Sequence, residues 1–398
     1  MNRLGDSMED IVIVSGARTA IGTLGGALSE TPASDLGAHV IRAAVERAGL
    51  SPEQIDQVIL GCVGQVAEDG YIARHASIKA GMPIGTPAYT VNRICGSGLE
   101  AINTAARWIQ TGDAEIVVAG GAENMSMMPY YVRKARFGYK YGDGTLEDGT
   151  QDLVTDPFED YPMGMTAENL AAQFEVSREL QDEYAIRSQE RARKAIDAGY
   201  FKEQIAPIEA KKGRNTVTFD TDEHPRETSM EALGKLRPAF KQDGSVTAGN
   251  ASGINDGAAA VVVMSASKAK ELGIKPRMRL VARAEAGVDW KIMGSGPIPA
   301  IQNVMKKANL NVQDMDVIEL NEAFAAVAAA CSVALDLPQD KTNPNGGAVA
   351  LGHPVGATGT ILAVKTMYEL ERTGGRYGLV SLCIGGGQGI ASIFERVS

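Results

Sequence analysis

Cys95 lies at a junction that suits a reactive thiol. A strand-like segment ends in the run Val91-Asn92-Arg93-Ile94-Cys95-Gly96-Ser97-Gly98, and a helical pattern begins there. The first backbone N–H groups of a helix have no partner inside the helix, and the helix dipole is positive at that end. Both effects favour the thiolate, which is the nucleophilic form of cysteine. A free cysteine is otherwise most often a buried, inert thiol, but the small residues after Cys95 leave room for a group on its sulfur.

Three runs near the C-terminus carry groups that could act together with such a thiol. Asn321-Glu322-Ala323-Phe324 places an amide after an apolar segment, and the glycine-rich run from Gly346 to Pro354 contains His353. An imidazole can accept a proton near neutral pH. The run from Cys383 to Gly389 supplies a second thiol. Together the runs predict a nucleophile, a base, an amide and a further acid or base.

Simpler interpretations exist for two of these runs. An asparagine after a strand is often only a turn former, which is the alternative for Asn321. The glycines after Cys383 could instead wrap around an anion. They lack the Lys-Ser/Thr pair of a P-loop and the spacing of a dinucleotide fingerprint, so a phosphate-binding loop is not favoured.

The other histidines and cysteines give no comparable signal. His39 and His75 lie within helical patterns, His224 lies in a polar loop, and Cys62 and Cys331 lack a glycine-rich frame. No CxxC pair is present, so neither a zinc site nor a disulfide framework is expected. Scattered free cysteines fit a reducing compartment, and we expect a cytoplasmic protein.

Composition excludes several classes of function. The net charge of −10 argues against a general nucleic-acid binder, although local basic residues can still bind a phosphate. No apolar stretch approaches the ~20 residues that a membrane-spanning helix needs. Residues 1–10 contain three acidic side chains and no apolar core, which is not typical of a targeting peptide. We expect neither a nucleic-acid nor a membrane partner.

The chain alternates between strand-like and helical patterns. Leu36, Val40, Ile41 and Val45 follow helical spacing, and a second helix is expected after Cys95. The expected strands are Ile11–Val14, Val58–Leu60, Ala88–Val91 and Ile116–Ala119. This order predicts an α/β protein with a largely parallel sheet that is covered by helices.

The C-terminal third repeats the order of the N-terminal third. Ala308-Asn309-Leu310 lies 260 positions after Ala48-Gly49-Leu50, and the strand-like run Val317–Leu320 lies at nearly the same offset from Val58–Leu60. A repeat this long indicates two similar domains. The loop-rich segment between them reads as an insertion. We predict an N-terminal half at 1–124 plus 254–274, an inserted loop domain at 125–253 and a C-terminal half at 275–398.

From Arg18-Thr19 to the final strands, the sequence closely resembles the thiolase family. The resemblance rests on the runs around Cys95, Asn321, His353 and Cys383. It implies the thiolase fold, a layered α/β arrangement of two βαβαβαββ halves with an inserted loop domain. It also implies reversible acyl transfer between coenzyme A and acetyl-CoA, with acyl-CoA as substrate and no permanently bound cofactor.

The resemblance assigns a role to each of these groups. Cys95 would carry the acyl group as a thioester, and His353 would be its base. Asn321 would position a water that forms an oxyanion hole with His353. Cys383 would exchange the α-proton, and the N–H groups of Cys383 and Gly385 would form a second oxyanion hole for the enolate.

The resemblance also implies where coenzyme A binds. The pantetheine arm would contact Ala248 and Ser252, and the adenine would lie near Arg226, which taken alone could be an ordinary surface residue. Phe240 and Phe324 would wall the tunnel. Met163 would line the acyl pocket.

Pro162 stands where short-chain biosynthetic thiolases often have histidine. With Ser229-Met230 nearby, this part of the sequence is more similar to degradative 3-ketoacyl-CoA thiolases. The loop Met125–Glu147 matches one that joins two thiolase dimers, which implies a homotetramer.

Two alternatives stay open. A decarboxylating ketoacyl synthase pairs cysteine with His-His or His-Asn, and the second cysteine, Cys383, argues against it. A catalytically silent thiolase-like scaffold or acyl-binding subunit typically lacks one of the four groups, all of which this chain retains.

Overall fold

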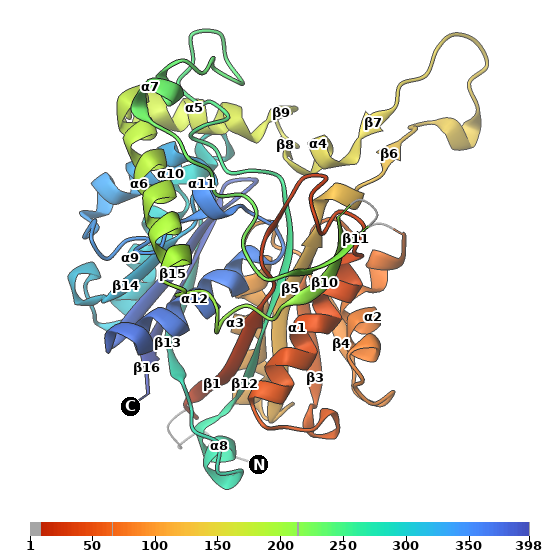
Figure 1. Ribbon diagram of the computed structural model, residues 1–398, viewed down its shortest axis with the longest axis vertical. Helices are drawn as coiled ribbons and strands as arrows, with labels where there is room; N and C mark the ends of the chain where they lie inside the picture. Colours follow the sequence, from red (N-terminus) through yellow and green to blue (C-terminus); the bar gives the residue numbers. More distant parts are fainter. Residues whose placement is uncertain (1–8, 66, 213–214, 398) are drawn as a thin grey trace.

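The computed structural model describes residues 9–65, 67–212 and 215–397 (Figure 1). Residues 1–8, where we expect no targeting peptide, lie outside the described residues. The core is one ten-stranded sheet in the order β14-β15-β16-β13-β1-β12-β5-β3-β4, with β2 paired to β12. Its strands are β1 (Ile11–Arg18), β2 (Gly22–Thr23), β3 (Gln57–Gly61), β4 (Ala88–Val91), β5 (Ile116–Asn124), β12 (Asn255–Ser265), β13 (Met278–Gly287), β14 (Val317–Leu320), β15 (Tyr377–Ile384) and β16 (Gln388–Arg396).

The sheet is mixed, so the expectation of a largely parallel sheet is wrong. β3 pairs in parallel with β4 and β5, and β14 pairs in parallel with β15. The remaining neighbours in the sheet are antiparallel. The reason is that each half ends with a strand that turns back on its neighbour. In the second half, Gly386 and Gly387 have φ of 83° and 82°, and this left-handed backbone permits the tight turn between β15 and β16.

The duplicated halves share details of hydrogen bonding. The Asp56 carboxylate accepts hydrogen bonds of 2.8 Å from two consecutive N–H groups at the start of β5. Asp316, 260 positions later, accepts bonds of 2.7 and 3.1 Å at the start of β15. Each aspartate follows a short 3₁₀ turn with a capping box, η1 (Pro52–Gln54) or η6 (Val312–Asp314). Each carboxylate therefore satisfies N–H groups at the entry to its strand.

Two helices meet between the halves of the sheet. α3 (Ser97–Thr111) and α12 (Thr358–Thr373) contact each other and strands of both halves. They approach so closely that a Cβ on Gly359 would lie 2.3 Å from the backbone nitrogen of Leu99. Cys95 and His353 each lie just before one of these helices. The crossing therefore brings the two residues to one place.

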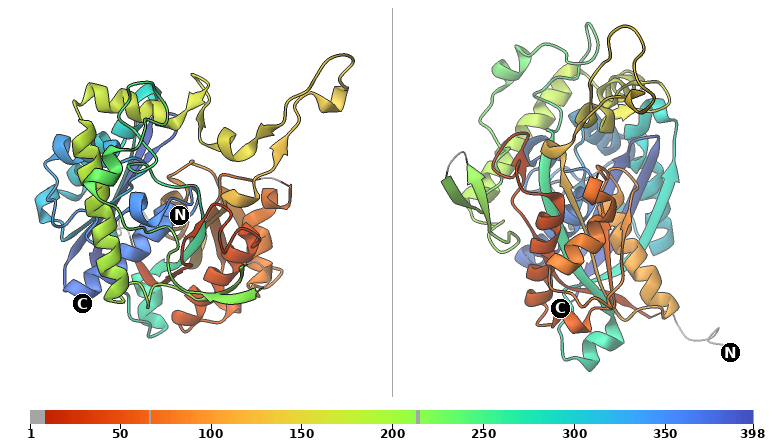
Figure 2. Two further views of the ribbon diagram at one scale, coloured as in Figure 1. Left: turned by 45° about the horizontal axis from the view of Figure 1, so that its top comes forward. Right: turned by 90° about the vertical axis from the view of Figure 1, so that its right-hand side faces the viewer.

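Other helices cover the outer faces of the sheet (Figure 2). α1 (Ala33–Arg47) packs on β12, β5 and β1 beside α2 (Ile72–Lys79). α9 (Pro297–Ala308) packs on β13 and β16. The helix expected around Leu36–Val45 and the four strands expected in the N-terminal third are confirmed, most of them longer at one or both ends. No helix in the described ranges is long and apolar enough to cross a membrane.

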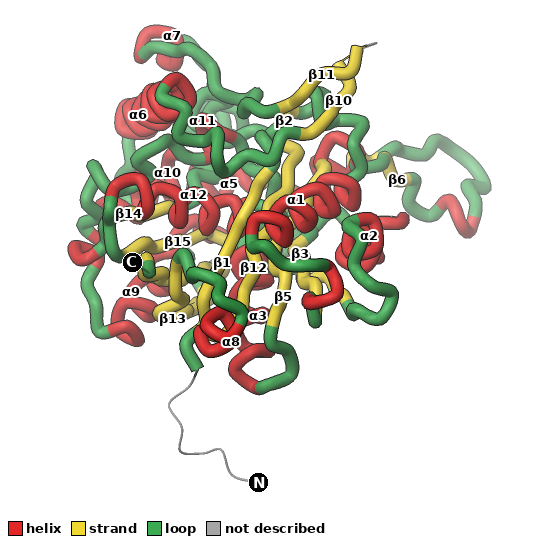
Figure 3. The backbone as a smooth tube through the Cα atoms, turned by 60° about the horizontal axis from the view of Figure 1, so that its bottom comes forward, coloured by secondary structure: helices red, strands yellow, loops and turns green. Residues whose placement is uncertain are grey.

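The segment between β5 and β12 leaves the sheet after Asn124 and returns at Asn255. Asn124 lies opposite Asp256, so the two strands are neighbours although the segment separates them (Figure 3). Strands β6 (Tyr130–Tyr131) and β7 (Glu147–Asp148) form a hairpin, the β6–β7 arm, that projects from the body (Figures 1 and 2). The division into three domains stays a prediction. The elements of this segment are β6 (Tyr130–Tyr131), β7 (Glu147–Asp148), α4 (Gly149–Leu153), β8 (Thr155–Asp156), β9 (Tyr161–Pro162), α5 (Met163–Gln173), α6 (Arg178–Asp197), β10 (Ile208–Lys212), β11 (Asn215–Phe219) and α7 (Met230–Gly234).

Candidate active site

Cys95 is presented by a strained turn directly before α3. Ile94 has φ of 44°, which is rare for a β-branched residue. The Ser97 hydroxyl stabilises this turn, since it accepts the Arg93 N–H at 2.8 Å and donates to the Ile94 carbonyl at 2.7 Å. Cys95 is partly exposed, whereas the other three cysteines are buried. The turn therefore makes Cys95 the one accessible thiol among the four.

His353 has a single tautomer that fits its surroundings. Its Nδ1 lies 2.7 Å from the Thr358 hydroxyl, and that hydroxyl donates its only hydrogen to the Pro354 carbonyl at 2.9 Å. Thr358 must then accept a hydrogen bond from Nδ1–H. The lone pair is left on Nε2, which lies 3.4 Å from Nδ2 of Asn321. His353 therefore presents an unprotonated Nε2, which accepts a hydrogen bond from the Asn321 amide and can accept a proton.

The two groups are both neutral at pH 7. Burial raises the pKa of the Cys95 thiol to about 11, although a hydrogen bond from the Gly385 N–H opposes the rise. Burial lowers the pKa of His353 to about 4. The expectation of a thiolate at Cys95 is therefore not met in the free protein. Desolvation is the largest cause of the rise in the Cys95 pKa, and it outweighs the backbone hydrogen bonds that favour the thiolate.

Asn321 and Glu322 follow β14. The Asn321 side chain is buried, and its Oδ1 has no hydrogen-bond partner among the described residues. A buried amide oxygen without a partner is unusual and marks a place for a water or a reacting group. The Glu322 carboxylate accepts bonds from Ser188 at 2.6 Å, Asn343 at 2.8 Å and the Val349 N–H at 3.1 Å. Glu322 thereby ties this loop to α6 and to the glycine-rich run before His353.

One cavity of ≈150 Å³ collects most of the expected site. Cys95, His353 and Gly385 line it, together with Ser252, Met163, Phe240 and Phe324. The two phenylalanine rings meet edge to face with centroids 6.1 Å apart. Gly164 is needed beside them, since a Cβ there would lie 2.2 Å from the Phe240 ring.

Cys383 does not line this cavity; it lies near the end of β15, two residues before Gly385. It is fully buried in β15, and burial first, then the nearby Cys95, raises the pKa of its thiol well above the usual range. Cys331 adds to the same rise. Cys383 is therefore close enough to Cys95 to interact with it, but it does not line the cavity wall.

Arg226 and Ala248 lie outside the cavity, on the surface. The Arg226 guanidinium donates to the Ala248 carbonyl at 2.7 Å, and both residues are exposed. Ser252, which lines the cavity, donates its hydroxyl to the Ala323 carbonyl at 2.9 Å. The residues expected to contact coenzyme A thus fall into an outer pair and an inner group.

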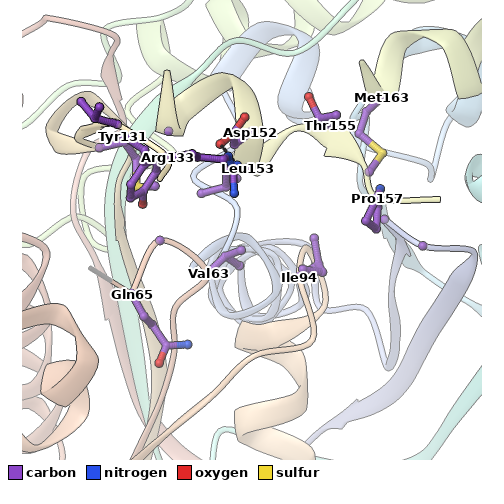
Figure 4. Close-up of a pocket in the computed structure, with 16 residues that line it drawn as sticks. Val63, Gln65, Ile94, Tyr131, Arg133, Asp152, Leu153, Thr155, Pro157 and Met163 are labelled. Atoms are coloured by element: carbon purple, nitrogen blue, oxygen red, sulfur yellow. Dashed lines mark hydrogen bonds and ion pairs between the residues drawn. The ribbon is translucent and has the colours of Figure 1, made fainter. Parts of the chain in front are cut away.

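A larger cavity of ≈610 Å³ opens at the base of the β6–β7 arm (Figure 4). It shares Ile94, Leu153, Met163 and Gly385 with the first cavity. An ion pair of 2.9 Å between Arg133 and Asp152 stands at its polar side. Residues far apart in the chain form this cavity, so no local pattern in the sequence predicts it.

Thr358 and Glu123 were also missed. Glu123 is buried and accepts N–H groups of Val63, Gly64 and Gly356 at 3.0, 2.9 and 2.8 Å, so it joins the first half to the segment after His353. Burial raises the pKa of its carboxyl. A hydroxyl five residues after a histidine, at the start of a helix, was the only signal for Thr358 in the sequence.

Comparison with known proteins gives the family. The family model described as "Thiolase, N-terminal domain" matches residues 11–267, and "Thiolase, C-terminal domain" matches residues 274–396. The chain belongs to the thiolase family. This thiolase is 51% identical over 391 residues to beta-ketothiolase BktB of Cupriavidus necator, covering 98% of this chain and 99% of that protein. It is 50% identical over 393 residues to an acetyl-CoA acetyltransferase of the same organism, covering 98% of this chain and 100% of that one.

Solved thiolases share its fold. The crystal structure of the Bacillus anthracis acetyl-CoA acetyltransferase superposes with a TM-score of 0.97 at 46% identity, covering 99% of this thiolase and 100% of that chain. Human mitochondrial 3-ketoacyl-CoA thiolase superposes with a TM-score of 0.96 at 46% identity, covering 98% and 100%. The expected fold is confirmed. Within residues 9–65, 67–212 and 215–397, no group of three His, Cys, Asp or Glu is placed to hold a metal ion.

Proposed function

We propose that this thiolase is an acyltransferase that works through a Cys95 thioester. It condenses two acetyl-CoA molecules to acetoacetyl-CoA, and in reverse it cleaves 3-ketoacyl-CoA with coenzyme A. The observation that carries the proposal is that Cys95 and His353, whose Nε2 is unprotonated, line one cavity. Relatives at about 50% identity are named as acetyltransferases and a ketothiolase, so a silent scaffold is not favoured.

The first half-reaction loads Cys95. The neutral His353 Nε2 takes the proton of the Cys95 thiol as the sulfur attacks the thioester carbonyl of acetyl-CoA. The bond to the coenzyme A sulfur then breaks, and His353 returns the proton to that sulfur. The Gly385 N–H already points at the Cys95 sulfur. We therefore place it on the oxygen of the thioester that forms there, and not on the enolate.

The second half-reaction makes or breaks the carbon–carbon bond. Cys383 first gives its proton to His353. The resulting Cys383 thiolate then takes the α-proton of a second acetyl-CoA. The enolate carbon attacks the Cys95 thioester, the Cys95 sulfur leaves, and His353 returns a proton to it. Asn321 would hold a water, and that water together with the Nε2–H of the protonated His353 ring would stabilise the enolate oxygen. The buried Oδ1 of Asn321, without a partner, supports the water.

The outer residues would hold the carrier. Arg226 and Ala248 would lie against the adenine end and the upper pantetheine arm, and Ser252 against its inner end. Phe240 and Phe324 would wall the path to Cys95, with Met163 at the acyl group. In this order the residues run from the protein surface to the cavity. Coenzyme A would act as a substrate that leaves after each half-reaction. We further propose a cytoplasmic homotetramer.

Peptide mass spectrometry after incubation with acetyl-CoA tests the proposal. We expect an acetyl adduct on the peptide that contains Cys95 and none on that peptide in Cys95→Ser, which should lose turnover in both directions. An adduct on Cys383 or Cys62 in place of Cys95 would overturn the assignment. Rates with a series of 3-ketoacyl-CoA lengths then define the acyl group that this thiolase prefers.

A further inference from the structure

We propose that Asn255 is the positioning residue that holds His353 in place for proton transfer. The inference rests on the proposed role of His353 as the base. Asn255 lies at the start of β12, in the first half of the fold, and its side chain is fully buried. His353 comes from the second half. Asn255 therefore joins the base to the half that carries the nucleophile.

Each polar atom of the Asn255 amide has a partner. Its Oδ1 accepts a hydrogen bond from the backbone N–H of His353 at 2.9 Å, and its Nδ2 donates to the Gly22 carbonyl at 2.9 Å. The second hydrogen of Nδ2 faces Nδ1 of His224 at 3.5 Å. The reversed amide would place NH₂ against the His353 N–H and oxygen against the Gly22 carbonyl. The orientation is therefore settled by its partners.

The backbone before His353 lies directly against this amide. Gly352 has φ of 102°, and a Cβ there would lie 2.5 Å from Cγ of Asn255. Only glycine permits both the backbone conformation and the close approach. Asn255 itself is in register with Thr23 of β2, so the side chain projects from a paired strand. A rigid strand holds a functional group more accurately than a loop does.

Two contacts then define the place of the imidazole. Thr358 sets the direction of the ring through Nδ1, and Asn255 sets the position of the backbone that carries the ring. Without the Asn255 oxygen, a buried N–H would have no partner, so the loop would shift to find one. Proton transfer from Cys95 needs the acceptor within hydrogen-bond reach. The expected loss is therefore in the rate of acylation and not in coenzyme A binding.

Asn255→Asp and Asn255→Leu separate the contacts. Asp keeps an acceptor for the His353 N–H and loses the donors to Gly22 and His224, whereas Leu keeps the shape and loses both. We expect single-turnover acetylation of Cys95 to fall roughly 10- to 100-fold in Leu and less than about fivefold in Asp. The coenzyme A Kd, measured by calorimetry, should stay within about twofold in both. If Leu gives no soluble protein, Asn255→Ala removes the same acceptor without added bulk.

Asn103→Leu is the matched control. Asn103 is fully buried in α3 and accepts a hydrogen bond of 3.0 Å from Ser392, so its loss disturbs the core at another place. Acetylation at the wild-type rate in Asn255→Leu, an equal loss in Asp and Leu, or the same loss in Asn103→Leu would each overturn the inference. Wild-type protein that is not acetylated on Cys95 would instead overturn the proposed function.

Discussion

Thr358 and His353 form the contact that decides which nitrogen of the imidazole can act. The Thr358 hydroxyl lies 2.7 Å from Nδ1 and donates its own hydrogen to the Pro354 carbonyl. Nδ1 must therefore carry a proton, and Nε2 is the ring nitrogen that can accept one. A hydrogen bond to one ring nitrogen commonly sets the tautomer of a functional histidine.

Thr358→Val should slow acetylation of Cys95 by about 10- to 100-fold, because the ring can then adopt the other tautomer and turn away from Cys95. Thr358→Ser should keep most of the rate. Thr366→Val is the control, since Thr366 lies in the same helix and only donates to the Leu362 carbonyl. A single-turnover assay with acetyl-CoA measures all three. A wild-type rate in Thr358→Val would show that the hydroxyl does not set the tautomer.

The rate at which iodoacetamide alkylates Cys95 should rise with pH, by about tenfold per unit between pH 6.5 and 9. The sign follows from the pKa of about 11, which keeps the thiol protonated throughout this range. His353, with a pKa of about 4, stays neutral and adds no charge. Peptide-resolved mass spectrometry separates Cys95 from the three buried cysteines. A flat rate below pH 8 would instead show a thiolate–imidazolium pair in the free enzyme.

Asn321→Ala should lower kcat by ~10²–10³ and leave the coenzyme A Kd nearly unchanged. The amide would act on the charge that develops in the transition state and not on the bound substrate. Steady-state thiolysis of acetoacetyl-CoA gives kcat and KM, and calorimetry gives the Kd. A raised KM with an unchanged kcat would refute this role.

Cys383→Ala should separate the half-reactions. The variant should still accept an acetyl group on Cys95, because His353 serves that sulfur. It should fail to exchange the α-hydrogens of acetyl-CoA for deuterium and fail to condense or cleave, because one base cannot lie within ~3 Å of both protons. Cys331→Ala is the control, since it removes another buried thiol. Deuterium exchange at the wild-type rate in Cys383→Ala would mean that another group takes the α-proton.

The β6–β7 arm should join subunits into a tetramer. Phe137 and Tyr141 on this arm are 86% and 102% exposed, and exposed large side chains on a projecting segment indicate a contact surface. Light scattering should give about four times the chain mass of 42.0 kDa, and Phe137→Ser with Tyr141→Ser should lower it to a dimer. Val333→Ser, at an exposed position on α10 (Ala325–Leu335), should leave the mass unchanged. A wild-type monomer at micromolar concentration would contradict the prediction.

Local patterns in the sequence were sufficient for much of the fold. The expected strand at Ala88–Val91 matches β4, and the expected strand at Val317–Leu320 matches β14, because both runs are rich in residue types that favour strands. The repeat at 260 positions also appears in the hydrogen bonds of Asp56 and Asp316. Whether neighbouring strands run parallel or antiparallel could not be predicted from local patterns. Their direction depends on where the chain returns to the sheet after an insertion, and local periodicity does not encode this.

The sequence by itself was enough to identify the thiolase family by resemblance, and it pointed to the runs that contain Cys95, Asn321, His353 and Cys383. Only the tertiary structure decided the protonation of these groups and which side chains hold them in place. The start of a helix predicts a thiolate, but burial in the folded site raises the pKa of Cys95 to about 11. Thr358 and Asn255 hold His353 from different halves of the fold. Desolvation and contacts between distant segments arise only when the chain is packed, and for that reason the sequence pattern does not contain them.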